Sequence, residues 1–211
     1  MSAEVLQGFL ESLKGQITVV VIIGLLLFGI MIISSKEKMN TKALTYSAIM
    51  IVMAFVLNQV TLFKMPQGGS VTPFSMFIIV LIAYFFGTRQ GIMAGMAFGL
   101  LDLLINPYAV HPVQILLDYP FAFGALGLAG LTRNMKHGLV SGYIIGIASR
   151  FVCAFLSGVI FWGMYAPEGF SAVTWAIVYN ITYIGAEGIM TVVLVSIPAV
   201  KNLINRVKKS I

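Results

Sequence analysis

Charged residues are scarce in this chain: they make up 9% of its 211 residues, whereas 59% are hydrophobic. So little sequence remains outside a membrane that a soluble catalytic domain is excluded. The single cysteine, Cys153, lies in an apolar run, which excludes a disulfide framework and a cysteine metal site. The two histidines, His111 and His137, fall in predicted loops and have no metal-ligand spacing. We therefore expect neither a metal nor another cofactor.

The motifs of membrane enzymes and ATPases are also missing. The sequence has no HExxH motif, no Walker motif and no histidine inside an apolar span that could act as a base. An intramembrane enzyme is therefore disfavoured, and any use of ATP must depend on partner proteins. The first apolar run lacks a small-residue cleavage site, so we expect no cleaved signal peptide.

Apolar runs of membrane-spanning length fill most of the chain. Each is close to the ~17–25 residues that a helix needs to cross ~30 Å of hydrocarbon, and none alternates as barrel strands do. We predict an all-α integral membrane protein, in which one additional N-terminal transmembrane helix and its cytoplasmic linker (1–38) precede a six-helix membrane domain (39–211). The predicted spans are 16–34, 42–63, 71–87, 91–107, 112–131, 138–163 and 172–199.

The net charge of +6 is distributed unevenly over the loops. Basic residues gather on alternate loops, at Lys36, Lys38, Lys42, Arg89, Arg133, Lys136, Lys201, Arg206, Lys208 and Lys209. The other loops hold only Lys64, besides Lys14 near the start. By the positive-inside rule, this pattern predicts a multi-pass protein of the cell membrane with its N-terminus outside and its C-terminus in the cytoplasm.

Glycines recur every four residues in two of the spans. They form the series Gly91, Gly95, Gly99 and the series Gly138, Gly142, Gly146. Small residues at this spacing let helices approach closely in lipid. We interpret both series as packing surfaces within one bundle; the alternative is a face for a partner protein.

Four ionisable residues lie inside the predicted spans, at Asp102, Asp118, Arg150 and Glu187. Ionisable groups are costly in hydrocarbon, so each is a candidate functional residue. Arg150 and Glu187 should lie at matching depth on antiparallel helices, which predicts a buried ion pair that Asp102 can join. The alternative is that these residues form a substrate or proton site.

Asp118 belongs to a second polar group nearer the outer surface. It lies about two turns below that surface, with Gln114 one turn above it and Asn180 at similar depth. Large aromatic residues fall near this level, at Tyr119, Trp162, Trp175 and Tyr179. A carboxylate, an amide and several rings suit a flat, cationic molecule with an amino-substituted ring. Aromatic residues also favour membrane interfaces without any ligand, so the rings alone do not establish a site.

Five segments, taken together, resemble a known family. They are Met65–Ser70 (MPQGGS), His111–Tyr119 (HPVQILLDY), Ser157–Trp162 (SGVIFW), Ala166–Gly169 (APEG) and Tyr179–Tyr183 (YNITY). In order and spacing they resemble the thiamine-specific substrate-binding (S) subunits of energy-coupling factor (ECF) transporters, the ThiT/YuaJ family, over about Lys42–Val200. The resemblance implies a six-helix S component that captures thiamine from outside. It also implies a transmembrane coupling subunit and two cytoplasmic ATPase subunits as partners.

The resemblance also implies roles for particular residues. It places the binding carboxylate at Asp118, followed by Tyr119, and a gate over the site at Gln67, Gly68 and Gly69. It places pocket aromatics at Trp162 and Trp175, and a pocket asparagine at Asn180. With Gln114 and Tyr179, these ten residues are the predicted substrate-binding site.

The chain departs from the family pattern in three places. Ala154 stands where many members have a pocket histidine, and the docking motif Ala-x-x-x-Ala reads Ala48-x-x-x-Val52. The third departure is the additional N-terminal span. The leading hypothesis is a thiamine-capture subunit. The alternative is a self-sufficient proton- or ion-coupled transporter of thiamine or a related heterocyclic vitamin, with Asp102, Arg150 and Glu187 as the relay.

Overall fold

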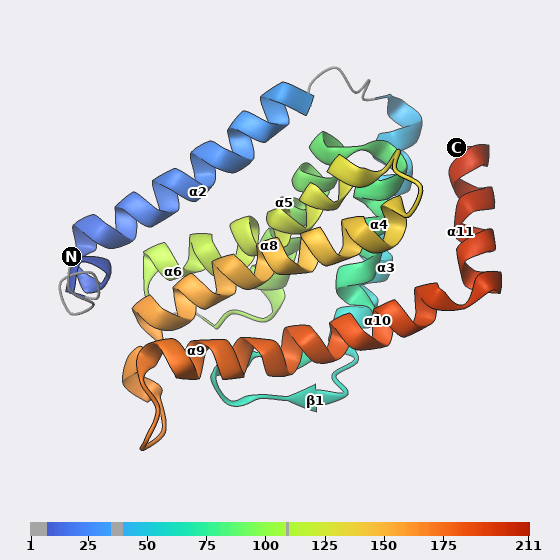
Figure 1. Ribbon diagram of the computed structural model, residues 1–211. Coiled ribbons are helices and arrows are strands. Elements are labelled where there is room, and N and C mark those ends of the chain that lie inside the picture. The colour runs from blue at the N-terminus through green and yellow to red at the C-terminus, as the bar shows by residue number, and fades with distance from the viewer. Residues whose placement is uncertain (1–7, 35–39, 109) are drawn as a thin grey trace.

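The computed structural model describes residues 8–34, 40–108 and 110–211, and these residues are mainly helical (Figure 1). The longer helices are α2 (Leu13–Ile33), α3 (Thr41–Gln59), α4 (Ser75–Phe86), α5 (Thr88–Ile105), α8 (Gly138–Phe161), α9 (Ala172–Asn180), α10 (Ala186–Ser196) and α11 (Pro198–Ser210). One composite segment runs through α6 (Pro112–Leu116), η3 (Leu117–Phe121), α7 (Ala122–Ala125) and η4 (Leu126–Thr132). The short elements are β1 (Phe63–Lys64), η2 (Pro66–Gly68), β2 (Ser70–Val71), η5 (Gly163–Tyr165) and η6 (Ile181–Gly185).

The all-α membrane fold predicted from the sequence is confirmed, and each predicted span coincides with a helix or a composite helix. Within the described residues, five of these segments are long and apolar enough to cross a membrane: Leu13–Ile33, Thr41–Gln59, Pro112–Thr132, Gly138–Phe161 and Ala172–Ser196. The helices α4 and α5 complete the set. The protein is therefore a multi-pass membrane protein.

Two predicted spans are too long at their C-terminal ends. The second ends at Gln59, and the residues after it form a loop that contains the β1–β2 hairpin. The last ends at Ser196, because Ile197 is extended and Pro198, which has no N–H to donate, begins the separate helix α11. Figure 1 shows α11 turning sharply away from α10.

The first glycine series packs α5 against the composite segment Pro112–Thr132. A side chain at Gly95 would collide with the Phe123 carbonyl and one at Gly99 with the Tyr119 carbonyl. One at Gly91 would collide with Ala83 of α4 and would lie 3.0 Å from Gly127. The glycines of the second series pack α8 against η4, including the C-terminal end of η4, and an added side chain there would collide in the same way. Both series are therefore packing surfaces within the bundle, as predicted.

Two long helices are interrupted by π-helical turns at the level of the candidate site. The first is η3, which contains Pro120. Because Pro120 has no N–H, the regular ladder fails there, and the Ala122 N–H bonds to the Leu117 carbonyl five residues back. The second is η6, between α9 and α10. π-Helical turns of this kind are frequent at functional sites.

The additional helix α2 lies along one side of the bundle (Figure 1). Leu27 is buried there, and Gly24 packs on the Phe121 ring of η3. Most other apolar side chains of α2 are exposed on the protein surface, as expected for a helix that faces lipid. The predicted boundary after residue 38 lies outside the described residues, as do Lys36 and Lys38.

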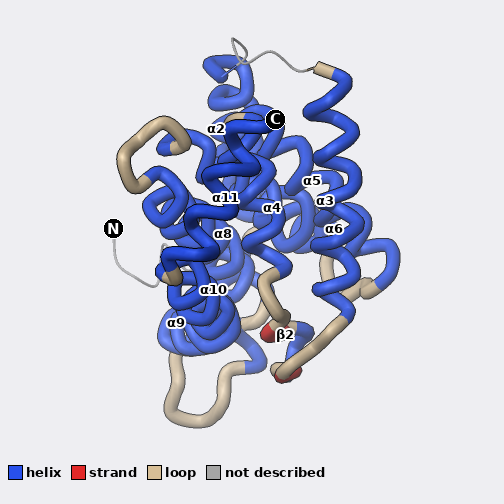
Figure 2. Tube along the Cα trace, turned by 90° about the vertical axis from the view of Figure 1, so that its right-hand side faces the viewer, coloured by secondary structure: helices blue, strands red, loops and turns tan. Residues whose placement is uncertain are grey.

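The other basic residues assigned to the cytoplasmic side include a group that meets at one end of the molecule. Lys42 Nζ donates to the Ser210 carbonyl at 3.3 Å, and Lys208 Nζ donates to the Arg133 carbonyl. Lys208 also lies over the Tyr84 ring, 3.8 Å from its centroid. Figure 2 shows the β-hairpin at the opposite end from the C-terminus. Which end faces the cytoplasm stays a prediction.

Candidate functional site

A cavity of about 450 Å³ lies beneath the loop between α3 and α4, and all ten predicted site residues line it. Gln67, Gly68 and Gly69 come from this loop. Gln114, Asp118 and Tyr119 come from α6 and η3, Trp162 from the end of α8, and Trp175, Tyr179 and Asn180 from α9. The structure thus brings the whole predicted set together, and its role in binding stays a prediction.

Asp118 is aimed into the cavity by its neighbours on the same segment. Gln114 Nε2 donates to Asp118 Oδ2 at 2.5 Å. The Gln114 amide is itself fixed, because Oε1 accepts from the Val110 N–H at 3.2 Å and Nε2 also donates to the Tyr108 carbonyl at 3.3 Å. The Ser157 hydroxyl and the Trp162 indole N–H also lie close to this carboxylate. The Gln114 hydrogen bond occupies only Oδ2, which leaves Oδ1 to face the cavity and a ligand.

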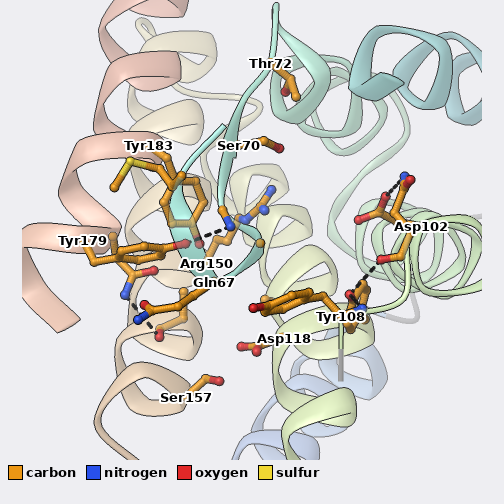
Figure 3. Close-up of a pocket in the computed structure, with 18 of the residues that line it drawn as sticks. Gln67, Ser70, Thr72, Asp102, Tyr108, Asp118, Arg150, Ser157, Tyr179 and Tyr183 are labelled. Carbon is orange, nitrogen blue, oxygen red and sulfur yellow. Dashed lines mark hydrogen bonds between the residues drawn. The ribbon is translucent and has the colours of Figure 1, made fainter. Parts of the chain in front are cut away.

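Ser157 faces Asp118 from helix α8 (Figure 3). Ser157 is 1% exposed, and its hydroxyl has no hydrogen-bond partner in the described structure. A buried hydroxyl without a partner is costly, so a ligand group that bonds to it would gain affinity. We did not predict Ser157 as a site residue. The spacing of Arg150, Ala154 and Ser157, all on one helical face that lines the cavity, was the available signal.

Aromatic rings form the outer wall of the cavity. The rings of Trp162 and Tyr108 stack with centroids 5.4 Å apart and an interplanar angle of 16°. The rings of Trp175 and Tyr179 lie 5.7 Å apart on α9. Tyr108 was not among the predicted residues; it follows Pro107 in a short loop, where no periodic pattern marks it. These ring faces offer stacking and cation–π contacts to a flat, positively charged ligand.

The loop over the cavity is held down by α9. The Tyr179 hydroxyl accepts from the Gly69 N–H at 2.8 Å and donates to the Pro66 carbonyl. Trp175 Nε1 donates to Gln67 Oε1 at 3.4 Å. The loop needs glycine at Gly68, where φ is +90° and an added Cβ would lie 2.8 Å from the Tyr108 ring. In this structure the loop is therefore closed over the cavity.

Tyr119 and Asn180 support the site from two sides. The Tyr119 hydroxyl donates to the Asn106 carbonyl at 3.0 Å and accepts from the Tyr108 N–H at 2.8 Å, so it holds the loop that carries Tyr108. Asn180 Nδ2 donates to the Ala176 carbonyl at 2.8 Å and to the Ala154 carbonyl at 3.3 Å. With its amide nitrogen engaged by the backbone, Asn180 presents an acceptor oxygen to the cavity.

The predicted ion pair between Arg150 and Glu187 is wrong. Glu187 Oε1 accepts from the Met76 N–H at 2.8 Å and Oε2 from the Thr72 hydroxyl at 2.7 Å. The Arg150 guanidinium instead lies over the Phe123 ring, 3.9 Å from its centroid. No ion pair joins Arg150 to a carboxylate within the described residues.

Asp102 has different hydrogen-bond partners from Glu187 and from Asp118. Its Oδ1 accepts from Asn58 at 2.8 Å and from Asn106 at 3.1 Å, and Figure 3 shows it across the cavity from Tyr179 and Tyr183. All three of Asp102, Arg150 and Glu187 line the cavity. In the described part of the chain, no three His, Cys, Asp or Glu side chains are grouped to hold a metal ion.

Comparison with known proteins gives consistent matches. The family described as "Thiamine transporter protein (Thia_YuaJ)" matches residues 44–206, which leaves α2 outside the match. The thiamine transporter ThiT of Bacillus subtilis is 36% identical over 152 residues, or 64% of this chain and 79% of the relative. The ThiT of Lacticaseibacillus paracasei is 31% identical over 136 residues, or 56% of this chain and 68% of the relative. A solved structure of ThiT from Listeria monocytogenes superposes with a TM-score of 0.62 at 26% identity, and the match covers 75% of this chain and 96% of that one.

Proposed function

The chain belongs to the Thia_YuaJ family of thiamine transporter proteins, and on that premise we propose that it captures thiamine with high affinity at the outer face of the cell membrane. It acts as the S subunit of an ECF-type, ATP-driven vitamin importer. Transport rather than catalysis is its function, since its relatives are named as transporters.

The observation that carries the proposal is a carboxylate that lines the cavity beside a wall of aromatic rings. Thiamine has an aminopyrimidine ring and a positively charged thiazolium ring. Asp118 Oδ1 can accept from the amino group, because its other oxygen is already held by Gln114. The stacked rings of Trp162 and Tyr108 offer π-faces to a cationic ring. A cavity of about 450 Å³ also lies within the usual range of small-molecule sites.

The division of labour with partner subunits follows from what the chain contains. It has no nucleotide-binding motif, so energy must come from elsewhere. We propose that a transmembrane coupling subunit and two cytoplasmic ATPases supply it to the membrane domain 39–211. The segment 1–38 is proposed as an additional helix and linker outside the vitamin-binding domain. The basic end of the molecule faces the cytoplasm, so the cavity opens outward.

Titration calorimetry of the purified protein in mild detergent tests the capture of thiamine. Thiamine should bind at one site without ATP, and riboflavin serves as a matched control with a flat but uncharged ring system. The absence of thiamine binding by folded protein would overturn the proposed substrate, and tight riboflavin binding would replace it.

Reconstitution in liposomes separates capture from self-sufficient transport. The purified protein alone should bind thiamine without accumulating it, under an imposed proton gradient or without one. Uptake in cells should require co-expressed coupling and ATPase subunits, and should persist when the proton gradient is collapsed while ATP is maintained. Gradient-driven accumulation by the protein alone would establish the secondary-transporter alternative instead.

A further inference from the structure

Glu187 has an environment that the proposed capture of thiamine does not explain. It is 2% exposed, and each of its carboxylate oxygens has a hydrogen-bond partner from a distant part of the chain. Its partners, the Thr72 hydroxyl and the Met76 N–H, flank the point where the loop over the cavity enters α4. The Ser75 hydroxyl lies 2.6 Å from the Thr72 hydroxyl and extends the same network.

Helix α4 depends on this contact because its own sequence gives it no cap. The residue before the helix is Phe74, which has a φ of +66° and no side-chain acceptor. The first N–H groups of a helix need acceptors from outside it, and they favour negative charge. From α10, Glu187 supplies an acceptor to one of these groups, the Met76 N–H, and so acts as an N-cap that comes from another helix.

The same face of the last span also holds the tip of the loop. Trp175, Tyr179, Tyr183 and Glu187 follow one another at intervals of four residues, and all line the cavity. Trp175 and Tyr179 contact the tip through Gln67, Pro66 and Gly69. Glu187 contacts the base of the loop through Thr72. Figure 3 shows the loop residues Gln67, Ser70 and Thr72 in sequence along the cavity.

The two attachments differ in depth. The base is buried, with Thr72 and Ser75 at 2% and 1% exposure. The tip is more exposed: Gln67 is held by hydrogen bonds of 3.4 Å to Trp175 and Tyr165, and the shorter bonds from the tip to α9 depend on one side chain, the Tyr179 hydroxyl. Contacts that are exposed and long break more readily than short, buried ones. The loop should therefore open at its tip while its base stays attached.

We propose that Glu187 is a positioning residue, which fixes the base of the loop and thereby sets how long the closed state retains the ligand. This inference rests on the proposed function, because thiamine is the ligand. Glu187 acts through Thr72 and Met76 rather than through the vitamin. Losing its carboxylate leaves the buried Met76 N–H without its acceptor and breaks the hydrogen bond that links the Thr72 hydroxyl to α10, although that hydroxyl keeps its contact with Ser75. This destabilises the closed position of the loop.

Thiamine release is the measurement that tests this role. The chain has two tryptophans, Trp162 and Trp175, and both line the cavity, so stopped-flow tryptophan fluorescence follows binding and release. Glu187→Leu and Thr72→Val should each speed thiamine release by about tenfold or more. Because both remove the same contact, the double variant should release thiamine little faster than Glu187→Leu alone. Glu187→Gln retains an acceptor for the Met76 N–H and should restore most of the slow release.

Thr191→Val is the matched control. Thr191 is fully buried on the same helix, one turn beyond Glu187, but does not line the cavity, and its hydroxyl has no partner among the described residues. Its release rate should equal that of the wild type. Unchanged release in Thr72→Val would overturn the proposal, and so would equal acceleration in Thr191→Val. If Glu187→Leu does not fold, Thr72→Val decides alone. A wild-type protein that binds no thiamine contradicts the proposed function, whereas wild-type binding with unaltered variants contradicts only the role of Glu187.

Discussion

Replacing Asp118 by asparagine should weaken thiamine binding more than the loss of one ordinary hydrogen bond. A hydrogen bond to a charged group contributes about 1.5–3 kcal/mol, which corresponds to a rise in Kd of about 12- to 160-fold. The structure places the expected effect toward the upper end of that range, because the new amide can be oriented in only one way.

The restriction comes from Gln114. Its Oε1 is held by the Val110 N–H and its Nε2 by the Tyr108 carbonyl, so Nε2 must keep facing residue 118. The amide oxygen of the variant would therefore turn to Gln114, and its NH₂ group would face the cavity. There it would meet the amino group of the aminopyrimidine, which is also a donor. The variant thus loses an acceptor and gains a mismatch between two donors.

Titration calorimetry measures this difference, with Asp102→Asn as the matched control. Asp102 lines the same cavity, but its Oδ1 is already bonded to Asn58 and Asn106, so its replacement should change the Kd by less than about threefold, within the range of an ordinary hydrogen bond. An Asp118→Asn variant that folds and binds within about twofold of the wild type would refute the reasoning. An equal loss in Asp102→Asn would show that general charge in the cavity, not this contact, holds the ligand.

Three further predictions follow from the packing and the charges. Gly95→Leu should lower the free energy of unfolding by at least about 1–3 kcal/mol in a thermal-shift assay, because the Phe123 carbonyl occupies the space of the new side chain. The control Gly29→Leu, on α2, should be near neutral in that assay, since no atom lies within 4 Å of an added Cβ there. Arg150→Met and Glu187→Gln should lower thermal stability with a coupling below about 0.5 kcal/mol, and strong compensation in the double variant would restore the ion pair that the sequence suggested. In a Cys153→Ala background, a membrane-impermeant thiol reagent should label Glu168→Cys on intact cells but not Lys136→Cys, and the reverse pattern would invert the proposed orientation.

The helices were predictable because lipid imposes a simple requirement on each of them. An apolar run of sufficient length must become a helix, and the same reasoning located α2 before any contact was known. The ends of the helices were predicted less accurately than their positions. The residues after Gln59 leave the helix to cover the cavity, and the hydropathy of the run does not mark that change. The predicted last span runs past Pro198 for the same reason, because an apolar run continues through a proline that ends the helix by its missing N–H.

The site was predicted only in part, because the sequence gives the depth of a residue in the membrane but not its contacts. Depth along a span places Asp118 near Asn180, but depth does not give the rotation of a helix about its axis. Arg150 and Glu187 were matched in depth and still do not pair, because Thr72 and Met76 reach Glu187 from a loop far away in sequence. Ser157 and Tyr108 were missed because neither residue type signals a function by itself. The gate residues Gln67, Gly68 and Gly69 came from the family resemblance, and periodicity alone does not identify them.

The π-helical turn η3 also constrains how this segment can change in length during evolution. A π-helical turn closes over five residues where an α-helical turn closes over four, so η3 accommodates one extra residue in this segment. Deleting a single residue from Leu117–Phe121 would let the turn close as regular α-helix and keep α7 and η4 near their present rotation. Deleting a residue from α7 or η4 would instead turn the residues that follow by about 100°, and Gly127 would leave its narrow contact with Gly91. The length of this segment is therefore freer to change at the wide turn than in the helical stretch that packs against α5.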